Sequence, residues 1–354
     1  MGDEATSGPA VTTEREAAGG PAVTTERLEL GARNAAACLG IHAGDRVFII
    51  TDRARADLAA LVADACRARG GEVTARELEE YGARPLTTFP DALRADIAAA
   101  RPTATYYIAT AQPGELGLRQ PLLPYLAQEL RVRHGHMIGI TPAVMADAMC
   151  ADYDRVYART VQVYDIVKNA RTIHVTSAKG TDVTATFNPD WRWIPCHGRY
   201  DEQGQWGNLP EGETFTAPAT LEGRIVADVL GDYFSEKYGV LADPVTFEVA
   251  DGRIAEIHSA NAELPAELRR HFWEASNGRR AGEFAIGTLE GLTRLSGNLL
   301  QDEKMPGLHV AFGNPYPQFT GADWDSPVHV DVVATGCTIT VDGRAIIRDG
   351  AFVI

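Results

Sequence analysis

The sequence predicts an α/β N-terminal domain with a parallel sheet, followed by a mixed α+β, mostly antiparallel C-terminal domain that binds metal. Three observations predict this division: strand and helix patterns alternate in the first half, strand patterns dominate the second, and carboxylates and imidazoles gather near the C-terminus. A length of 354 residues also exceeds the roughly 150 residues of a typical domain. We expect a disordered tail at 1–27, the α/β domain at 28–170 and a catalytic metal-binding domain at 171–354.

Composition and charge describe a globular protein that handles small molecules. The chain is 45% hydrophobic and 23% charged, which suffices for a sizeable core. Its net charge of −15 argues against nucleic acid and anionic membrane surfaces as partners. The cysteines are scattered and form no C-x-x-C pair; they are Cys38, Cys66, Cys150, Cys196 and Cys337. No apolar run approaches the ~18 residues of a membrane-spanning helix. We predict a cytoplasmic enzyme with a small-molecule or short-peptide substrate.

The N-terminal segment contains a duplicated octapeptide, GPAVTTER, at 8–15 and again at 20–27. It is rich in Ala, Gly, Thr and Glu and poor in large apolar side chains, which is typical of disordered chain. Two copies are too few for a solenoid. We assign this tail no function.

Helix and strand patterns alternate between residues 28 and 149. Helical patterns cover 28–39, 54–69, 90–100 and 142–149, and strand patterns cover 46–51, 73–78, 104–109 and 136–141. This alternation is typical of an open parallel sheet with helices on both faces. The first strand ends in T-D-R-A at 51–54, without the glycine-rich loop that holds a nucleotide phosphate. We therefore interpret this sheet as structural, and His134 and His136 as surface or packing residues.

The second half is rich in strand patterns. A helix over 152–169 leads into it, and a second helix is expected at 265–275. Strands are expected at 172–177, 182–187, 221–229, 245–249, 253–259, 337–341 and 345–348. The turn sequences A-K-G-T at 178–181 and D-G at 342–343 predict hairpins, and hence antiparallel pairing.

The segment from Glu283 to Asp331 has the residues for metal chemistry. His329 and Asp331 are two positions apart in a V-H-V-D run, so on a strand both side chains point to one face. His309 and Glu283 each lie in or beside another apolar run of strand type. Carboxylates and imidazoles bind divalent zinc, cobalt, manganese or iron. A metal site is one interpretation, and histidines satisfied inside a core are the other.

A shaped loop at 206–218 contains Glu211 and Glu213 between two glycines and two prolines. Its residue types are also those of an ordinary exposed acidic turn. The loop alone does not choose between these interpretations.

Five short blocks in the second half carry a family resemblance. They read N-L-P-x-G-E-x-F-T-x-P at 208–218, G-E-F-A-x-G-T at 282–288, D-E-K at 302–304, L-H-x-A-x-G at 308–313 and H-x-D at 329–331. In this order they resemble the thermophilic-type metallo-aminopeptidases, the aminopeptidase T and aminopeptidase S enzymes. The resemblance covers residues 28–354, weakly in the first half and specifically in the second.

The resemblance implies a homodimeric exopeptidase with two divalent ions of zinc, cobalt or manganese. The ligands that it implies are Glu213, Glu283, His309, His329 and Asp331. Tyr316 falls at the position of the catalytic tyrosine, whose hydroxyl would stabilise the tetrahedral oxyanion. Glu213 is also the candidate for moving a proton to the leaving amine.

Two departures leave other functions open. Only 19 residues separate His309 from His329, a shorter connection than the family has, and the N-terminal tail is unlike the family. A related enzyme, 2,5-dihydroxypyridine 5,6-dioxygenase, is similar in fold, and His309, His329 and Asp331 match its use of two histidines and one carboxylate for a single Fe(II). A specialised biosynthetic metalloenzyme or a binding protein on the same scaffold is a third alternative.

Overall fold

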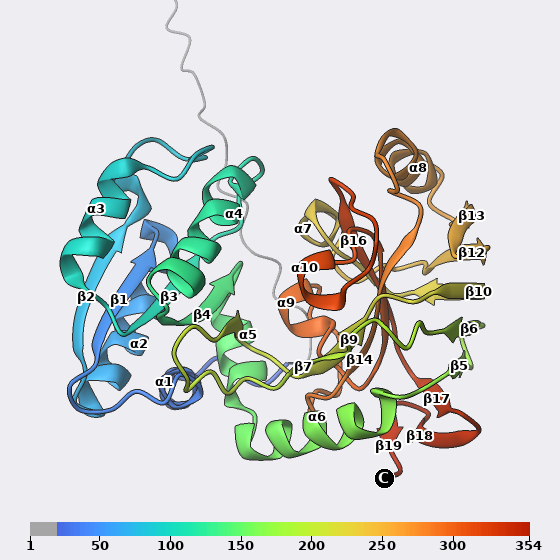
Figure 1. Cartoon of the computed structure of the whole chain (residues 1–354), viewed down its shortest axis with the longest axis horizontal. Helices are drawn as coiled ribbons and strands as arrows, with labels where there is room; N and C mark the ends of the chain where they lie inside the picture. The colour runs from blue at the N-terminus through green and yellow to red at the C-terminus, as the bar shows by residue number, and fades with distance from the viewer. Residues whose placement is uncertain (1–19) are drawn as a thin grey trace, which may run out of the picture.

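The N-terminal half is built on a parallel sheet. The computed structural model describes residues 20–354, so the first repeat copy and most of the predicted tail lie outside the described residues. Five strands pair in parallel in the order β2-β1-β3-β4-β8, and Figure 1 labels the first four of them. The strands are β1 (Arg46–Thr51), β2 (Glu72–Glu77), β3 (Ala104–Ala109), β4 (Arg133–Ile138) and β8 (Trp206–Asn208). The helices are α1 (Thr25–Cys38), α2 (Ala56–Ala68), α3 (Asp91–Ala100), α4 (Leu116–Pro124), α5 (Pro142–Ala146) and α6 (Tyr153–Val167).

The side chains of β1 point alternately to the two faces of this sheet. Val47 and Ile49 pack into one apolar cluster with α1 and α2, while Phe48 and Ile50 pack into another with α3 and α4. A strand whose side chains are buried on both faces is typical of a parallel sheet covered by helices. The alternating pattern of the sequence therefore predicted this layer arrangement correctly.

The C-terminal half contains two antiparallel sheets. The larger has the order β13-β12-β10-β6-β5-β17-β18-β19 and the smaller β11-β16-β15-β14-β9-β7. The larger sheet is formed by β5 (Thr172–Ser177), β6 (Asp182–Thr186), β10 (Thr220–Ala227), β12 (Val245–Ala250), β13 (Arg253–His258), β17 (Cys337–Val341), β18 (Arg344–Arg348) and β19 (Ala351–Phe352). The smaller is formed by β7 (Ile194–Cys196), β9 (Glu213–Thr216), β11 (Val229–Leu230), β14 (Ala281–Gly287), β15 (Gly307–Gly313) and β16 (His329–Ala334). The helices are α7 (Tyr233–Tyr238), α8 (Leu264–Glu274), α9 (Leu299–Asp302) and α10 (Pro317–Thr320).

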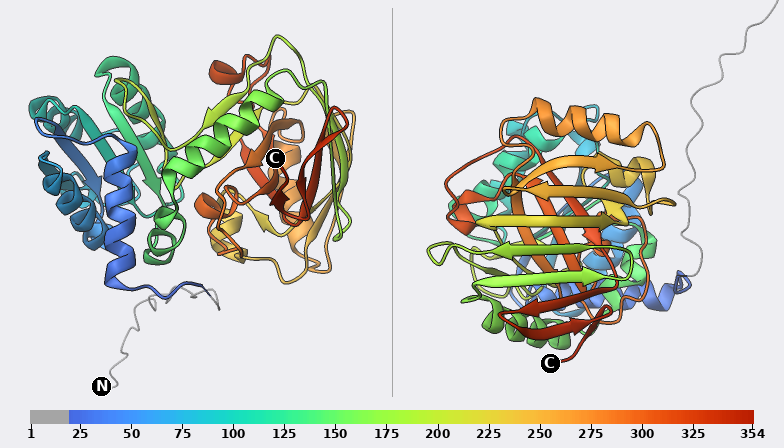
Figure 2. Two further views of the ribbon diagram at one scale, coloured as in Figure 1. Left: turned by 90° about the horizontal axis from the view of Figure 1, so that it is seen from below. Right: turned by 90° about the vertical axis from the view of Figure 1, so that its right-hand side faces the viewer.

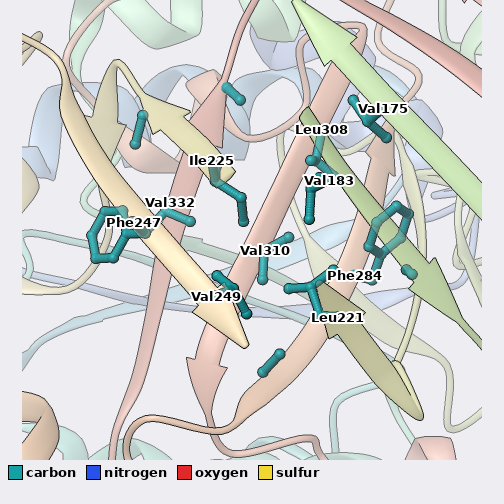
Figure 3. Close-up of a cluster of buried hydrophobic side chains, with 14 of the residues drawn as sticks. Val175, Val183, Leu221, Ile225, Phe247, Val249, Phe284, Leu308, Val310 and Val332 are labelled. Atoms are coloured by element: carbon teal, nitrogen blue, oxygen red, sulfur yellow. The ribbon is translucent and has the colours of Figure 1, made fainter. Parts of the chain in front are cut away.

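The two antiparallel sheets pack face to face. Figure 2 shows the strands of the larger sheet facing the viewer in its right-hand view, with the rest of the chain behind them. Ile225 and Phe247 of the larger sheet join Phe284, Val310 and Val332 of the smaller sheet in one buried cluster (Figure 3). Burial of each such side chain contributes about 1.5–3 kcal/mol. The predicted fold class, α/β followed by a mostly antiparallel α+β part, is confirmed.

Several expected boundaries were wrong. Strand β4 spans 133–138 rather than 136–141, because Gly139 turns the chain with a positive φ of 69°. Helix α1 begins at Thr25, inside the expected tail, with the Thr24 hydroxyl accepting a hydrogen bond from the Arg27 amide. Strand β8 was not predicted, and it joins the first sheet although it follows the proposed boundary near 170. The division into domains stays a prediction.

His134 and His136 are buried, so a surface role is wrong for both. His134 Nδ1 lies 2.8 Å from the Thr105 hydroxyl, and its Nε2 lies 3.2 Å from His136 Nδ1. Burial lowers the pKa of His134 to about 3, so the ring is neutral at physiological pH. The packing role remains the interpretation that fits these contacts.

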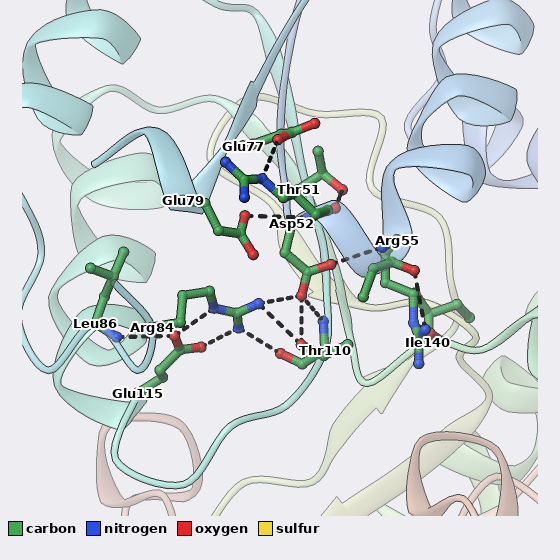
Figure 4. A network of polar contacts seen from close by, with 12 residues as sticks. Thr51, Asp52, Arg55, Glu77, Glu79, Arg84, Leu86, Thr110, Glu115 and Ile140 are labelled. Atoms are coloured by element: carbon green, nitrogen blue, oxygen red, sulfur yellow. Dashed lines mark hydrogen bonds and ion pairs between the residues drawn. The ribbon is translucent and has the colours of Figure 1, made fainter. Parts of the chain in front are cut away.

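A buried ionic network closes the carboxyl-end edge between β1 and β3 (Figure 4). The Arg84 guanidinium donates to Asp52 and Glu115, and its Nη2 donates to the Thr110 carbonyl at 3.0 Å. The Leu86 amide donates to Glu115 and the Thr110 amide to Asp52. We call Asp52, Arg84, Thr110 and Glu115 the Arg84 network. Strand order reverses here, at the position where open α/β sheets bind nucleotides, and the protein's own side chains satisfy this edge.

The segment around α9 packs the two halves together. Leu289 and Leu300 belong to the apolar cluster under α1 and α2 of the first half. Asn298 Nδ2 donates to the Gly139 carbonyl at 2.9 Å, and Gln301 Nε2 donates to Asp147 at 3.0 Å. Within residues 20–354, no helix is both long and apolar enough to cross a membrane.

Candidate metal centre

Four adjacent strands of the smaller sheet carry the predicted ligands. Glu213 is on β9, Glu283 on β14, His309 on β15, and His329 with Asp331 on β16. The register brings them to one face, because Ala311 pairs with Glu283 on one side and with Asp331 on the other. His309 lies two positions before Ala311, and His329 lies two positions before Asp331. Both histidines are thus on the same face as these residues.

The opposite face of the same strands is the apolar core. Phe284, Val310 and Val332 alternate with the ligand candidates and pack against the larger sheet (Figure 3). Alternation on three consecutive strands thus separates a polar face from an apolar one. Val330 and Val332, which alternate with His329 and Asp331, are fully buried.

His309 lies between two carboxylates. Its Nε2 is 3.1 Å from Glu213 Oε2 and 3.3 Å from Glu283 Oε1. The ion pair between His309 and Glu213 lacks hydrogen-bond geometry, so Glu213 Oε2 has no hydrogen-bond partner among residues 20–354, and neither has His309 Nδ1. Buried oxygen and nitrogen atoms without partners are costly, so a bound cation or water is the expected occupant.

His329 is oriented as a metal ligand requires. Its Nδ1 lies 2.8 Å from the Asn314 carbonyl, which can only accept, so Nδ1 carries the hydrogen. In the neutral ring the other nitrogen, Nε2, has its lone pair free, 3.6 Å from Glu283 Oε2 and 3.8 Å from Asp331 Oδ2. A histidine anchored through one nitrogen to a carbonyl is a recurring arrangement around bound metals.

Lys304 is surrounded by acids on the other side of Glu213. Its Nζ lies 3.0 Å from Glu211 Oε1, 2.8 Å from Glu213 Oε1 and 2.8 Å from Glu303 Oε1. An ammonium has three hydrogens, so each can be donated to a different carboxylate. The side chain of Lys304 is 1% exposed, and the acids offset the cost of burying its charge.

Ligand atoms of most of these residues are close enough to hold a cation, although His329 belongs to none of the groups that follow. Three groups of side chains place one ligand atom each within 4.8 Å of one another: Cys196, Glu211 and Glu213; Glu213, Glu283 and His309; and Glu303, His309 and Asp331. The second and third groups share His309 and consist of imidazole and carboxylate. The residues present therefore fit a divalent metal ion, by their donor types and by the unpartnered buried atoms.

Proton affinities in this cluster follow the charges. Burial would raise the pKa of Glu213, but Lys304 and His309 lower it to about 2. Burial would lower the pKa of His309, but Glu213 and Glu283 raise it well above its ordinary value. Burial raises the pKa of Glu303 to about 8. Without metal, His309 and Glu303 thus hold protons at atoms that could bind a metal ion. Metal binding would release these protons.

Tyr316 borders the metal centre with an aromatic ring. It adopts a left-handed conformation, with φ 50° and ψ 63°, directly before α10. Its ring centroid is 4.5 Å from that of His329 and 6.3 Å from that of Phe215. Phe319 of α10 contacts both Tyr316 and Trp206 of β8. Aromatic side chains thus extend from the centre to the first sheet.

The structure brings all the predicted site residues together and adds others. Glu211 and Glu213 are buried, so the alternative of an exposed acidic turn is wrong for this loop. The sequence interpretation gave no role to Glu211, Glu303 or Cys196. The available signals were the position of Glu211 two residues before Glu213, and the D-E-K run that contains Glu303.

Comparison with known proteins identifies a family. Residues 32–287, well over half of the chain, match the family model described as NicX: 2,5-dihydroxypyridine 5,6-dioxygenase. A 2,5-dihydroxypyridine 5,6-dioxygenase of Pseudomonas putida is 26% identical over 221 residues, which cover 59% of this chain. The matched stretch spans 61% of that enzyme's length, less than two thirds. The family match ends before His309, His329 and Asp331.

Two solved structures are equally similar in fold. The structure of the 2,5-dihydroxypyridine dioxygenase from Pseudomonas putida has a TM-score of 0.67 at 18% identity, covering 93% of this chain and 98% of that one. AmpT from Thermus thermophilus also has a TM-score of 0.67, at 19% identity, covering 93% of this chain and 99% of that one. The resemblance to aminopeptidases is thus supported by the fold, while the sequence comparison supports the dioxygenase family.

Proposed function

The chain belongs to the 2,5-dihydroxypyridine 5,6-dioxygenase (NicX) family, and we propose that it is an iron-dependent dioxygenase acting on a small hydroxylated aromatic ring. The observation that carries this proposal is that His309, His329 and Asp331 share one sheet face within the family's fold, with His309 and Asp331 in one group of close ligand atoms and His329 Nε2 3.8 Å from Asp331 Oδ2. Two histidines and one carboxylate are the ligand set of non-haem Fe(II) oxygenases. This function replaces the aminopeptidase as the leading hypothesis, because the sequence comparisons favour it.

The chain's own side chains support this reaction in three ways. His329, anchored on the Asn314 carbonyl, and His309 present ring nitrogens toward the carboxylates. Glu283, whose pKa is raised by burial, would accept a proton from a ring hydroxyl of a substrate bound beside it. Tyr316 offers an aromatic face beside His329, against which a planar ring can stack. Iron(II), when bound, would supply the redox chemistry with dioxygen.

A second candidate is the dinuclear hydrolase that the resemblance to the aminopeptidases implies. Glu213 and Glu283 exceed what one iron needs, and buried acids favour an additional divalent ion. AmpT has the same fold similarity as the dioxygenase. On this alternative two ions of zinc, cobalt or manganese would activate a water, with Tyr316 donating to the oxyanion.

One experiment separates these functions. Metal-free protein is reconstituted anaerobically with Fe(II), and oxygen consumption is measured with 2,5-dihydroxypyridine; in parallel, protein loaded with zinc, cobalt or manganese is tested on aminoacyl amides. We expect oxygen consumption that requires Fe(II) and is lost in His329→Ala. Amine release without oxygen consumption would instead establish the hydrolase. The control is His174→Ala, which removes an exposed histidine paired with Asp182 on the larger sheet.

The predicted homodimer stays a proposal. Size-exclusion chromatography with light scattering tests it, with twice the chain mass of 38.2 kDa as the expected result.

A further inference from the structure

The metal centre has two sides of different chemistry that meet at Glu213. On one side, Glu213 Oε2 faces His309 Nε2, close to Glu283. On the other side, Cys196, Glu211 and Glu213 form a group that includes a sulfur ligand. A thiolate attracts zinc and other thiophilic ions, whereas imidazole and carboxylate suit iron and manganese. Which side a metal enters therefore affects which metal is bound.

Glu211 is already satisfied by protein donors. Its Oε1 lies 3.0 Å from Lys304 Nζ and accepts from the Gly212 amide at 3.1 Å, and its Oε2 accepts from the Tyr200 hydroxyl at 3.1 Å. A carboxylate held by three donors has little remaining capacity for a metal ion. Glu211 is thus tied to the protein, although its oxygen lies at ligand distance from Cys196 and Glu213.

Lys304 also divides the two oxygens of Glu213 between two tasks. Oε1 accepts from Lys304 Nζ at 2.8 Å, while Oε2 faces His309 without a hydrogen-bond partner among residues 20–354. Glu213 therefore presents to the histidine side an oxygen without a hydrogen-bond partner in the described part of the chain, while its other oxygen is already bound by Lys304. The Lys304 ammonium holds a positive charge close to the place where a metal ion beside Cys196 would bind. This charge repels such an ion.

We propose that Lys304 is a built-in cation that keeps metal ions away from the Cys196–Glu211–Glu213 side of the centre and thereby selects a sulfur-free ligand set. Lys304 is in this sense a determinant of metal specificity. The inference deepens the proposed function and rests on it, because a histidine and carboxylate set suits an Fe(II) dioxygenase whereas a thiolate ligand favours zinc. Lys304 acts through the carboxylates that it holds and needs no contact with the substrate.

The test is Lys304→Met, which removes the charge and keeps much of the side chain's volume. Metal-free wild type and variant are saturated with Cd(II), desalted and analysed for ions per chain and for the ultraviolet absorption of a cadmium–thiolate bond. We expect no such absorption in the wild type. The variant should bind one more ion per chain, with thiolate absorption that disappears in Lys304→Met/Cys196→Ser. The control is Lys179→Met, which removes a half-exposed lysine paired with Asp228.

Two results would overturn the inference: a folded Lys304→Met protein with the wild-type ion count and no thiolate absorption, or thiolate absorption in the wild type itself. Should Lys304→Met fail to fold, the number of ions bound per chain is measured in Glu211→Gln instead. Because Glu211 binds protein donors, this variant should keep the wild-type ion count, and a lower count contradicts the inference. These readouts involve no oxygen, so a failed oxygenase assay refutes the proposed function and leaves the role of Lys304 standing, and the converse also holds.

Discussion

Two buried clusters of charge lie in the two halves of the chain, and they differ in how completely they are satisfied. In the Arg84 network, the guanidinium is saturated by Asp52, Glu115 and Thr110. In the metal centre, by contrast, Glu213 Oε2 and His309 Nδ1 lack hydrogen-bond partners among residues 20–354. Both clusters are buried, so burial alone does not separate a structural site from a functional one.

The candidate metal centre thus differs from the Arg84 network in having ligand atoms without hydrogen-bond partners, although single buried atoms elsewhere in the described part of the chain, such as His136 Nε2 and the Tyr107 hydroxyl, also lack them. A buried ionic network that is fully hydrogen-bonded stabilises one arrangement of the chain. A cluster that leaves ligand atoms unpartnered is costly unless something binds there. The Arg84 network also occupies the edge where open α/β sheets bind ligands, and its side chains are hydrogen-bonded to one another there.

The largest expected effect comes from His329→Ala. The variant removes a nitrogen that faces Glu283 and Asp331, so we expect metal affinity to fall by more than the roughly 10- to 100-fold that is typical for residues supporting a ligand. Isothermal titration of metal-free protein with Fe(II) or Mn(II) measures this. Unchanged affinity would remove His329 from the ligand set. His174→Ala should bind metal as the wild type does.

Arg84→Met should have the opposite profile, with stability lost and metal binding kept. Removing one partner of a buried pair leaves uncompensated charge, and such changes cost about 3–5 kcal/mol of unfolding free energy. Denaturant unfolding of the metal-free protein measures the cost. A loss below about 1 kcal/mol, or a weakened metal affinity in the folded variant, would contradict a purely structural role for the network.

The Arg84 network should also give a defined pH dependence. Burial alone would raise the pKa of Asp52, but hydrogen bonds from Thr110 and Arg84 outweigh it and lower this pKa. A lowered folded-state pKa stabilises the protein above the unfolded-state value of about 3.9, and this contribution is lost as the pH falls toward the folded-state value. The difference in unfolding free energy between wild type and Asp52→Asn should therefore be constant near neutral pH. It should shrink below about pH 4. A difference that grows on acidification would have the wrong sign.

The sequence predicted the layers of the fold because both sheet types leave a local pattern. β1 and β3 were placed correctly from continuous apolar runs, and the β5–β6 hairpin from its turn sequence. β4 was displaced because its polar residues, among them Arg133, are buried against specific partners such as Asp45. β8 could not be predicted, since three residues give no periodicity and their pairing with β4 joins distant parts of the chain.

The candidate site was predictable only in part, for a related reason. Spacing alone shows that His329 and Asp331 share a strand face, and the resemblance added Glu213 from a loop that otherwise looked exposed. Which strands lie next to each other is a property of the sheet order, so the contact between Glu213 and His309 is absent from any local pattern. The role of Lys304 is likewise a three-dimensional property, since Glu211 is far from it in the sequence.

The smallest expected effect comes from Arg67→Met, which tests whether an arginine–carboxylate hydrogen bond stabilises the fold when both side chains are exposed. Arg67 donates to Asp64 at 2.9 Å on the surface of α2, with 54% and 75% of the side chains exposed. Exposed pairs of this kind are worth roughly 0.2–1 kcal/mol, because water screens the charges and both side chains lose freedom. Arg67→Met should therefore change the unfolding free energy by less than about 1 kcal/mol, and less still at high salt. The same assay applied to Arg84→Met and Arg67→Met compares two arginine–carboxylate contacts that differ in their burial and in their number of partners. Similar losses of unfolding free energy in the two variants would mean that burial does not determine how much these contacts stabilise the protein. The Arg84 network would then have a role other than stabilising the edge of the sheet.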